Sequence, residues 1–189
     1  MSLEDKKKWD KKYKENPRLL EDREPSLFVK KYSLIPKGRE ALDLACGVGR
    51  NALFLESRGF KVDAIDISSV ALDILKSKSK GSINTILADL DSFEFSKSYD
   101  VIIKCNFLDR ELIEKSKKAL KKGGVFIIET YIEDKLNEKK DSNPNFLLKK
   151  DELLKIFKNG FEVLEYKTFW NESHELYKMK KAAIAVRKV

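Results

Sequence analysis

Short apolar runs and amphipathic segments alternate along the chain in a regular order. The apolar runs have the length of buried strands and lie at 41–45, 61–65, 83–87 and 99–105. Between them, Val70, Leu72 and Leu75 give one segment the single apolar face of a helix, with Ser68 as a natural N-cap. A second helix is expected over 108–120. This strand–helix alternation predicts an α/β fold built on a parallel sheet.

The C-terminal part of the pattern departs from a purely parallel arrangement. Further strands are expected at 125–130, 161–168 and 177–188, with a helix over 149–157. Gly123-Gly124 is expected to end the helix over 108–120. The link between the last two strands is too short for a parallel crossover, which needs a dozen or more residues. We therefore predict that the sheet ends in an antiparallel hairpin.

The region 40–68 contains a motif that predicts a ligand. A buried strand leads into a turn with Gly47 and Gly49, and a helix and a second strand ending on Asp66 follow. Glycines let the backbone approach a ligand closely, and the helix start offers free N–H groups. Asp66, 17 residues after Gly49, stands where a carboxylate accepts the hydroxyl groups of an adenosine ribose. The stretch predicts an adenosine-cofactor site.

Asp43 distinguishes between the adenosine cofactors. The stretch from Gly47 to Ala52 fits the loose dinucleotide pattern G-x-G-x-x-A, which alone is a weak signal. Asp43 lies four residues before Gly47, inside the first strand. Its charge would repel a pyrophosphate but hold an ammonium group. S-adenosylmethionine carries an ammonium group, so the sequence favours this cofactor over NAD.

The stretch Asp43-Leu-Ala-Cys-Gly-Val-Gly-Arg-Asn51 resembles the first motif of class I S-adenosylmethionine-dependent methyltransferases, with Ala45 where many members have a glycine. The later stretches 106–110, 128–131 and 143–148 are similar to those of the small tellurite-resistance-type methyltransferases. The resemblance implies a three-layer sandwich with a seven-stranded, mostly parallel Rossmann-like sheet. It also implies S-adenosyl-L-methionine as cofactor and S-adenosyl-L-homocysteine as product. One domain is expected over 1–189, with 1–38 as a helical cover and 39–189 as the core.

The resemblance implies a set of cofactor-binding residues. In the family an acid after the third strand contacts the adenine amino group, and Asp89 holds that position; the alternative is a simple turn aspartate. The implied residues are Asp43, Ala45, Cys46, Gly47, Gly49, Asn51, Asp66, Ile67, Asp89, Leu90 and Cys105, with Trp9 and Tyr13 from the N-terminal segment. Because Trp9 and Tyr13 are four residues apart, both lie on one helix face. That helix is either simply docked on the domain or a lid over the cofactor.

Methyl transfer from a sulfonium requires an aligned nucleophile and exclusion of water, so no catalytic triad need be visible. Since the first and fourth strands are neighbours in the implied order, 43–49 should lie beside 105–110. Candidates on the acceptor side are Asn106, Arg110, Tyr131 and His174. Arg110 would either bind an anionic acceptor or pair with a nearby acid, namely Asp109, Glu111 or Glu114. A lone loop histidine such as His174 is more often an ordinary surface residue.

The acceptor class is only partly constrained by the sequence. The fourth strand ends in Cys105-Asn-Phe-Leu108 and lacks the Asp/Asn-Pro-Pro-aromatic turn of enzymes that methylate exocyclic amines of DNA bases. We expect a small nucleophile such as a thiol or a chalcogen oxyanion. One alternative is an RNA or protein methyltransferase, favoured if N-terminal lysines and Lys139-Lys140 flank the site. Another is a catalytically silent module that binds S-adenosylmethionine.

Composition limits the classes of partner. The chain has 39 Lys and Arg residues against 31 Asp and Glu, a net charge of +8. A diffuse lysine excess is typical of a solvated surface, whereas nucleic-acid grooves add clustered arginines and aromatics. Cys46 and Cys105 form neither a disulfide framework nor a metal-ligand cluster, so no metal is expected. No apolar run approaches the ~20 residues of a membrane span. We expect a cytoplasmic monomer or homodimer.

Overall fold

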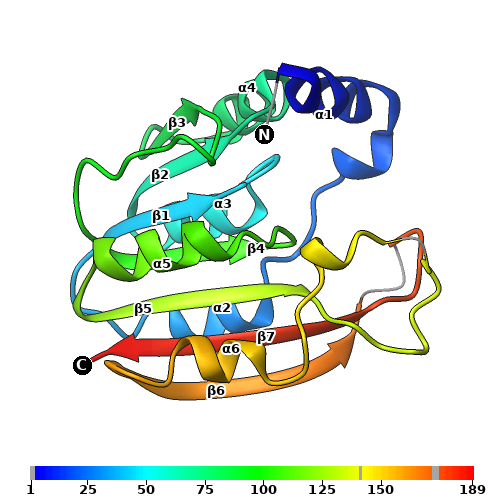
Figure 1. Cartoon of the computed structure of the whole chain (residues 1–189). Coiled ribbons are helices and arrows are strands. Elements are labelled where there is room, and N and C mark those ends of the chain that lie inside the picture. Colours follow the sequence, from blue (N-terminus) through cyan, green and yellow to red (C-terminus); the bar gives the residue numbers. More distant parts are fainter. Residues whose placement is uncertain (1–2, 141, 172–174) are drawn as a thin grey trace.

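The computed structural model describes residues 3–140, 142–171 and 175–189 and shows a mixed sheet with helices on both faces (Figure 1). Its seven strands follow the order β3-β2-β1-β4-β5-β7-β6. They are β1 (Glu40–Leu44), β2 (Lys61–Asp66), β3 (Ile83–Leu87), β4 (Tyr99–Cys105), β5 (Leu120–Tyr131), β6 (Phe161–Trp170) and β7 (Lys180–Lys188). Strands β1 to β5 pair in parallel, and β7 runs antiparallel to both β5 and β6. The predicted α/β sheet with an antiparallel hairpin is confirmed.

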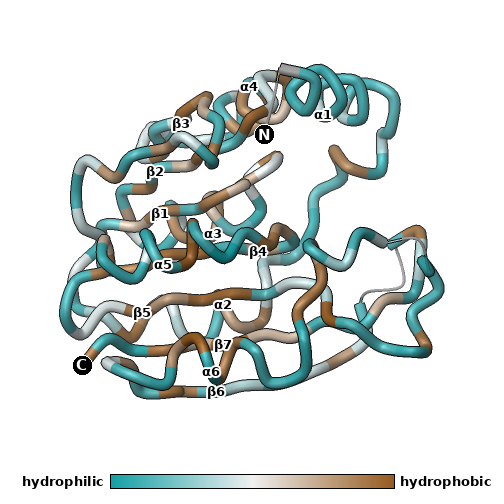
Figure 2. Tube along the Cα trace, viewed as in Figure 1, coloured by the Kyte–Doolittle hydropathy of each residue, from teal (hydrophilic) through white to brown (hydrophobic). Residues whose placement is uncertain are grey.

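Helices form a layer on each face of the sheet. The helices that the structure describes are α1 (Leu3–Glu15), α2 (Leu27–Tyr32), α3 (Arg50–Ser57), α4 (Ser69–Lys78), α5 (Arg110–Ala119) and α6 (Glu152–Ile156), with short 3₁₀ turns η1 (Pro17–Leu19) and η2 (Pro144–Phe146). Val29 of α2 and Leu55 of α3 belong to the apolar core on one face of the sheet. Ile113 of α5 belongs to the apolar core on the other face. The central strands are brown in Figure 2, whereas α1 is largely teal. None of the described helices is long and apolar enough to cross a membrane.

The predicted boundary between the helix over 108–120 and the following strand is wrong. Gly123-Gly124 does not end the helix: α5 ends at Ala119, and β5 begins directly at Leu120 and includes both glycines. The pairing of β4 with β5 then shifts register between Tyr99 and Val101. A Cβ on Gly124 would lie 2.9 Å from two backbone carbonyl oxygens, so glycine permits the close approach of the strands at this irregularity. The helix expected over 149–157 is likewise shorter, and β7 begins later than the predicted 177.

Helix α1 lies outside the two layers and docks on the start of α4. The Asp10 carboxylate accepts hydrogen bonds from the Ser68 hydroxyl at 2.7 Å and the Val70 N–H at 3.3 Å. The Ser68 Oγ atom in turn accepts from the Ala71 N–H at 3.2 Å, which confirms the predicted N-cap. Lys6 donates to Asp10 from one turn earlier, at 2.8 Å. The docking of α1 therefore depends on the residues that follow β2.

Candidate active site

The turn between β1 and α3 forms the floor of the candidate site. Three residues of this turn have left-handed backbone: Ala45 at φ 56°, Gly47 at φ 56° and Gly49 at φ 84°. A non-glycine residue in this conformation costs roughly 1–2 kcal/mol, so Ala45 is tolerated with some strain. At Gly49 a Cβ would lie 2.1 Å from Leu75 Cδ1 of α4, so a larger residue there would force the buried Leu75 side chain to shift. The turn is built for close backbone approach.

Asp66, at the end of β2, lies against the same turn. Its Oδ2 atom accepts the Gly47 N–H at 2.8 Å, and its Oδ1 atom accepts the Ser68 N–H at 2.9 Å. Burial raises the pKa of this carboxyl, opposed by the backbone hydrogen bonds. The fold therefore brings Asp66 beside the glycine turn, as the sequence spacing predicts. Its role toward a ribose stays a prediction.

Asp43 is buried beneath the turn, with 2% of its surface exposed. Its Oδ2 atom has no hydrogen-bond partner among the described residues. Burial raises the pKa of this carboxyl to about 7, although the Arg50 guanidinium opposes the shift. A buried carboxylate oxygen without a partner is costly unless a ligand supplies the missing donor. The site thus fits a ligand with an ammonium group.

The predicted adenine side lies at the same edge of the sheet. The Ala88 N–H donates to the Asp66 carbonyl oxygen at 3.2 Å, so the end of β3 adjoins the end of β2. Asp89 accepts the Asp91 N–H at 3.0 Å in a local turn, and Leu90 is buried. Ile67, the residue after Asp66, is buried as well. The expected residues are brought together, while the contact of Asp89 with adenine stays a prediction.

Tyr13 of α1 lies against the glycine turn. A Cβ placed on Gly47 would be 2.8 Å from the Tyr13 hydroxyl oxygen. Burial and the nearby Asp66 raise the pKa of Tyr13. The ring centroids of Trp9 and Tyr13 are 6.0 Å apart, as expected for one helix face. The helix is docked on the domain, and its Tyr13 lies at the turn; its action as a lid over the cofactor stays a prediction.

The residues predicted to lie on the acceptor side differ in the partners that the fold gives them. Asn106 has φ 57°, and its N–H donates to the Glu129 carbonyl oxygen at 2.7 Å. Arg110 pairs with none of its three expected partners; it forms an ion pair with Glu152 at 2.6 Å. Its guanidinium also donates to the carbonyls of 145 and 147, so it ties the loop before α6 to α5. The Tyr131 hydroxyl donates to Glu175. His174 lies outside the described residues.

Asn51 and Cys105 have surroundings that the sequence does not indicate. The Asn51 side-chain oxygen accepts the Ser26 N–H at 3.0 Å, which fastens the start of α2 to α3. Cys105 is buried at the end of β4, where burial, Glu129 and Asp43 raise the pKa of its thiol. Burial also raises the pKa of the Cys46 thiol in the turn. Both cysteines are free thiols with little tendency to ionise.

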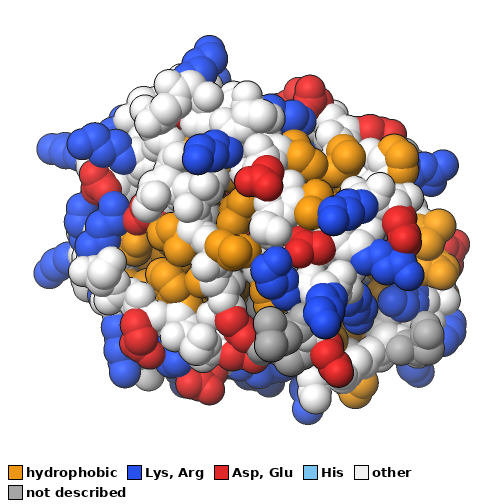
Figure 3. Space-filling model, turned by 90° about the horizontal axis from the view of Figure 1, so that it is seen from above, with side chains coloured by type: hydrophobic (Ala, Val, Ile, Leu, Met, Phe, Trp, Pro, Cys, Tyr) orange, Lys and Arg blue, Asp and Glu red, His pale blue; other side chains and the backbone are white. Residues whose placement is uncertain are grey.

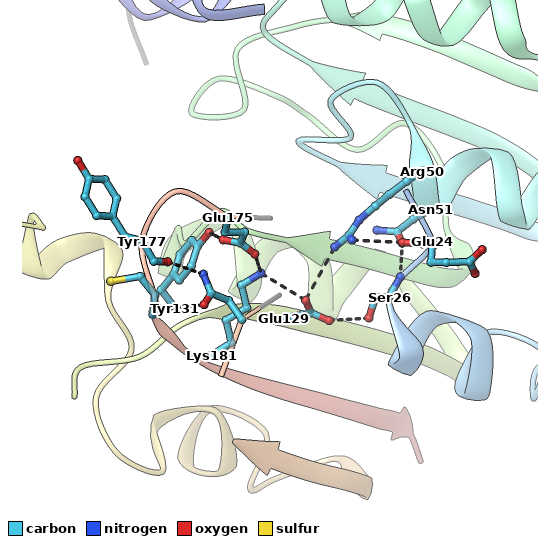
Figure 4. Close-up of polar contacts among 11 residues, drawn as sticks. Glu24, Ser26, Arg50, Asn51, Glu129, Tyr131, Glu175, Tyr177 and Lys181 are labelled. Carbon is cyan, nitrogen blue, oxygen red and sulfur yellow. Dashed lines mark hydrogen bonds and ion pairs between the residues drawn. The ribbon is translucent and has the colours of Figure 1, made fainter. Parts of the chain in front are cut away.

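Sequence reasoning missed a buried ionic cluster on the acceptor side. Glu129 of β5 and Lys181 of β7 are 5% and 2% exposed, respectively. Figure 4 shows Ser26, Arg50 and Lys181 pointing toward Glu129 from three separate parts of the chain. Lys181 also pairs with Glu175 at 2.6 Å. In the sequence each member of this cluster is only a charged residue near or within an apolar strand. That these residues meet becomes clear only from the register of the strands.

Known proteins are similar to this chain along most of its length. The family described as "Tellurite resistance protein TehB" matches residues 2–185. The chain is 29% identical over 170 residues to the "Probable S-adenosyl-L-methionine-dependent methyltransferase TehB" of Haemophilus influenzae, covering 79% of this chain and 57% of that protein. It is 31% identical over 118 residues to the "Putative methyltransferase YqeM" of Bacillus subtilis, covering 56% and 47%. The chain thus spans about half the length of these relatives.

A solved structure shows the same similarity across the fold. The crystal structure of TehB from Haemophilus influenzae superposes with a TM-score of 0.77 and 26% identity, covering 97% of this chain and 67% of that chain. The resemblance to this family that the motifs predict is confirmed. Because the family match runs through nearly every element of the fold, this chain belongs to the tellurite resistance protein TehB family.

Proposed function

We propose that this protein is an S-adenosylmethionine-dependent methyltransferase that acts on a small nucleophile, such as a thiol or a chalcogen oxyanion, by in-line displacement. The observation that carries the proposal is the Asp43 Oδ2 atom, which is buried without a partner among the described residues. The ammonium group of S-adenosylmethionine would supply a charged donor there. NAD offers no ammonium group, and its pyrophosphate would be repelled. The names of the relatives support the same cofactor.

The residues around the turn fit the remaining parts of this cofactor. Asp66 would accept the ribose hydroxyls, Asp89 would contact the adenine, and Gly47 would allow close approach of the backbone. When bound, S-adenosylmethionine supplies a methyl group that a nucleophile displaces. The task of the protein is then to align the two and exclude water. Tyr13, which lies against the turn, would contribute to that exclusion.

Tyr131 would contact the acceptor as a neutral hydroxyl rather than act as a base, with its own O–H donated to Glu175. Burial and the adjacent Glu175 raise the pKa of its hydroxyl, so the group stays protonated at neutral pH. Tyr131 is the last residue of β5, and Asn106 directly follows β4. Both lie at the carboxyl ends of neighbouring strands, where ligands of such sheets bind. Both are proposed to line the acceptor side.

Calorimetry with S-adenosylmethionine, S-adenosylhomocysteine and NAD tests the cofactor assignment. We expect the first two to bind and NAD to bind weakly or not at all; tighter binding of NAD would overturn the proposal. Methyl transfer is then measured with sodium tellurite, sodium selenite and 2-mercaptoethanol as acceptors. Binding of the cofactor without turnover on any of these acceptors would favour the silent binding module.

A second candidate is methylation of an anionic macromolecule such as RNA. Burial, and next the positive charge of Lys139, lower the pKa of Lys12, so a basic group of α1 and one of the loop after β5 interact. Lys139 and Lys140 also line an open pocket of about 310 Å³. Against this candidate, the basic side chains on the face that Figure 3 shows have acidic ones between them. Bulk RNA as acceptor at increasing salt concentration distinguishes the two functions.

A further inference from the structure

A row of polar side chains crosses the otherwise apolar face of the sheet that α2 and α3 cover. On this face β4, β5 and β7 contribute Ile103, Ile127, Ala183 and their apolar neighbours. Strand alternation places Asp43, Cys105, Glu129 and Lys181 on the same face, at its edge beside the glycine turn. The acids and the lysine in this row are almost completely buried.

Glu129 is the centre of this row. Its Oε2 atom accepts a hydrogen bond from the Ser26 hydroxyl at 2.6 Å. Its Oε1 atom lies 3.7 Å from Lys181 Nζ and 3.9 Å from an Arg50 guanidinium nitrogen. Lys181 continues the chain of contacts to Glu175, which accepts from the Tyr131 hydroxyl (Figure 4). One carboxylate thus connects the segment before α2, the start of α3 and the hairpin of β6 and β7.

Ser26 uses its hydroxyl for the contact with Glu129 instead of for capping its own helix. It occupies the N-cap position of α2, where serine normally accepts a hydrogen bond from the helix backbone. Here it makes no such cap, and its hydroxyl donates to Glu129 instead. Arg50 reinforces the attachment, because it donates to the Glu24 carbonyl oxygen at 3.2 Å. The segment that leads from α1 into α2 is therefore fastened to β5.

Stability alone is a poor reason for this arrangement. Burying paired charges is costly, and apolar residues of similar volume often pack as well or better. Neighbouring positions of the same face are indeed apolar, such as Ile127 and Ala183. A buried and hydrogen-bonded charge does, however, fix the relative positions of the elements that it joins. The cluster lies between the proposed cofactor turn and Tyr131, where relative position matters for methyl transfer.

We propose that Glu129 is a positioning residue of the methyl-transfer site. It holds the segment before α2 and the β6–β7 hairpin in fixed positions relative to each other. The residues over the proposed cofactor turn and those around Tyr131 therefore keep one arrangement. This inference rests on the proposed function for its catalytic consequence. The attachment itself is independent of the acceptor. Because its carboxylate oxygens are engaged by Ser26, Lys181 and Arg50, Glu129 positions other groups rather than accepting a proton from the acceptor.

The test compares Glu129→Gln and Ser26→Ala with wild type, and uses Glu162→Gln as the matched control. Glu162 is a half-exposed β6 glutamate paired with Arg187, and it makes none of the contacts of Glu129. Trypsin cleavage in the basic N-terminal segment 6–23 is followed by mass spectrometry. We expect about tenfold faster cleavage in both variants and the wild-type rate in Glu162→Gln. The double variant should add little to the single ones, because both changes act on the same attachment: Ser26→Ala removes its donor, and Glu129→Gln removes the charge of its acceptor.

Catalysis and cofactor binding provide the second readout. Affinity for S-adenosylhomocysteine should change less than about threefold, whereas kcat with selenite or 2-mercaptoethanol should fall about tenfold or more. Cleavage at the wild-type rate in both variants would overturn the inference, as would a parallel loss of S-adenosylhomocysteine affinity. If Glu129→Gln does not fold, Ser26→Ala decides by the same readouts. If wild type binds no S-adenosylhomocysteine, the proposed function fails while the cleavage comparison still tests the attachment.

Discussion

Replacing Asp43 with asparagine should stabilise the ligand-free protein at neutral pH and weaken cofactor binding at the same time. The carboxylate is 2% exposed, and one of its oxygens has no partner among the described residues. Burial, partly opposed by Arg50, raises its pKa from 3.8 to about 7. Asparagine has nearly the same shape and keeps an oxygen for the Ala52 N–H, but it carries no charge into the interior.

The pKa determines both the size and the pH dependence of the effect. A difference between 3.8 and about 7, at ~1.4 kcal/mol per pH unit, corresponds to a burial cost of at most about 5 kcal/mol for the charged Asp43. The folded protein holds this proton more tightly than the unfolded chain. The free energy of unfolding therefore falls as pH rises from about 4 to about 7, and the loss is complete above that range. Below pH ~4 both states are protonated, and the variant has no advantage.

Urea unfolding at pH 4, 6 and 8 measures this effect. Asp43→Asn should unfold at higher urea than wild type at pH 8, and the difference should shrink toward pH 4. Asp73→Asn on the exposed side of α4 is the control, and it should follow wild type at each pH. Stabilisation by S-adenosylhomocysteine should be smaller in Asp43→Asn, since the ammonium partner is gone. An unfolding midpoint at pH 8 equal to or below that of wild type would refute the reasoning.

Three further changes have defined outcomes. Asp66→Ala should weaken S-adenosylhomocysteine binding by ~1.5–3 kcal/mol in calorimetry, as for loss of a charged acceptor; unchanged affinity would count against the ribose contact. Gly49→Ala should lower the free energy of unfolding in urea by roughly 2–4 kcal/mol, because left-handed strain adds to a steric clash. Gly59→Ala, with φ 83° and open space around it, isolates the strain alone at roughly 1–2 kcal/mol; an equal loss in both would contradict the clash. Glu152→Gln should release the Arg110 contacts to the loop at 145–147 and speed its proteolysis, and an unchanged rate would show that Arg110 does not hold the loop.

Local signals account for the parts of the fold that the sequence predicts well. The glycine turn, the Ser68 cap and the short link of the hairpin each depend on residues close together in the chain. Asp43 and Asp66 could be singled out because a charged residue inside or at the end of an apolar strand is conspicuous. Their neighbourhood follows from the parallel order of β1 and β2, which strand–helix alternation implies.

Contacts between distant segments account for what the sequence did not indicate. Arg110 pairs with Glu152 rather than with an acid in its own helix, and no local pattern marks a partner 42 residues away. Glu129 and Lys181 meet only because β5 and β7 pair in one particular register. Gly123-Gly124 illustrates the opposite error, since a sequence that usually ends a helix serves here as an irregular start of a strand. Tertiary pairing overrides local preference at these points.

The packing of Trp9 on Tyr13 gives the protein an optical signal of its own. The two rings lie 6.0 Å apart, and the Tyr13 hydroxyl lies against the glycine turn. The chain has two tryptophans, and the other, Trp170, ends β6 in the distant hairpin. In a Trp170→Phe background, indole fluorescence would come from α1 alone. Rapid mixing could then resolve, without any attached dye, whether α1 moves before or after a ligand reaches the turn.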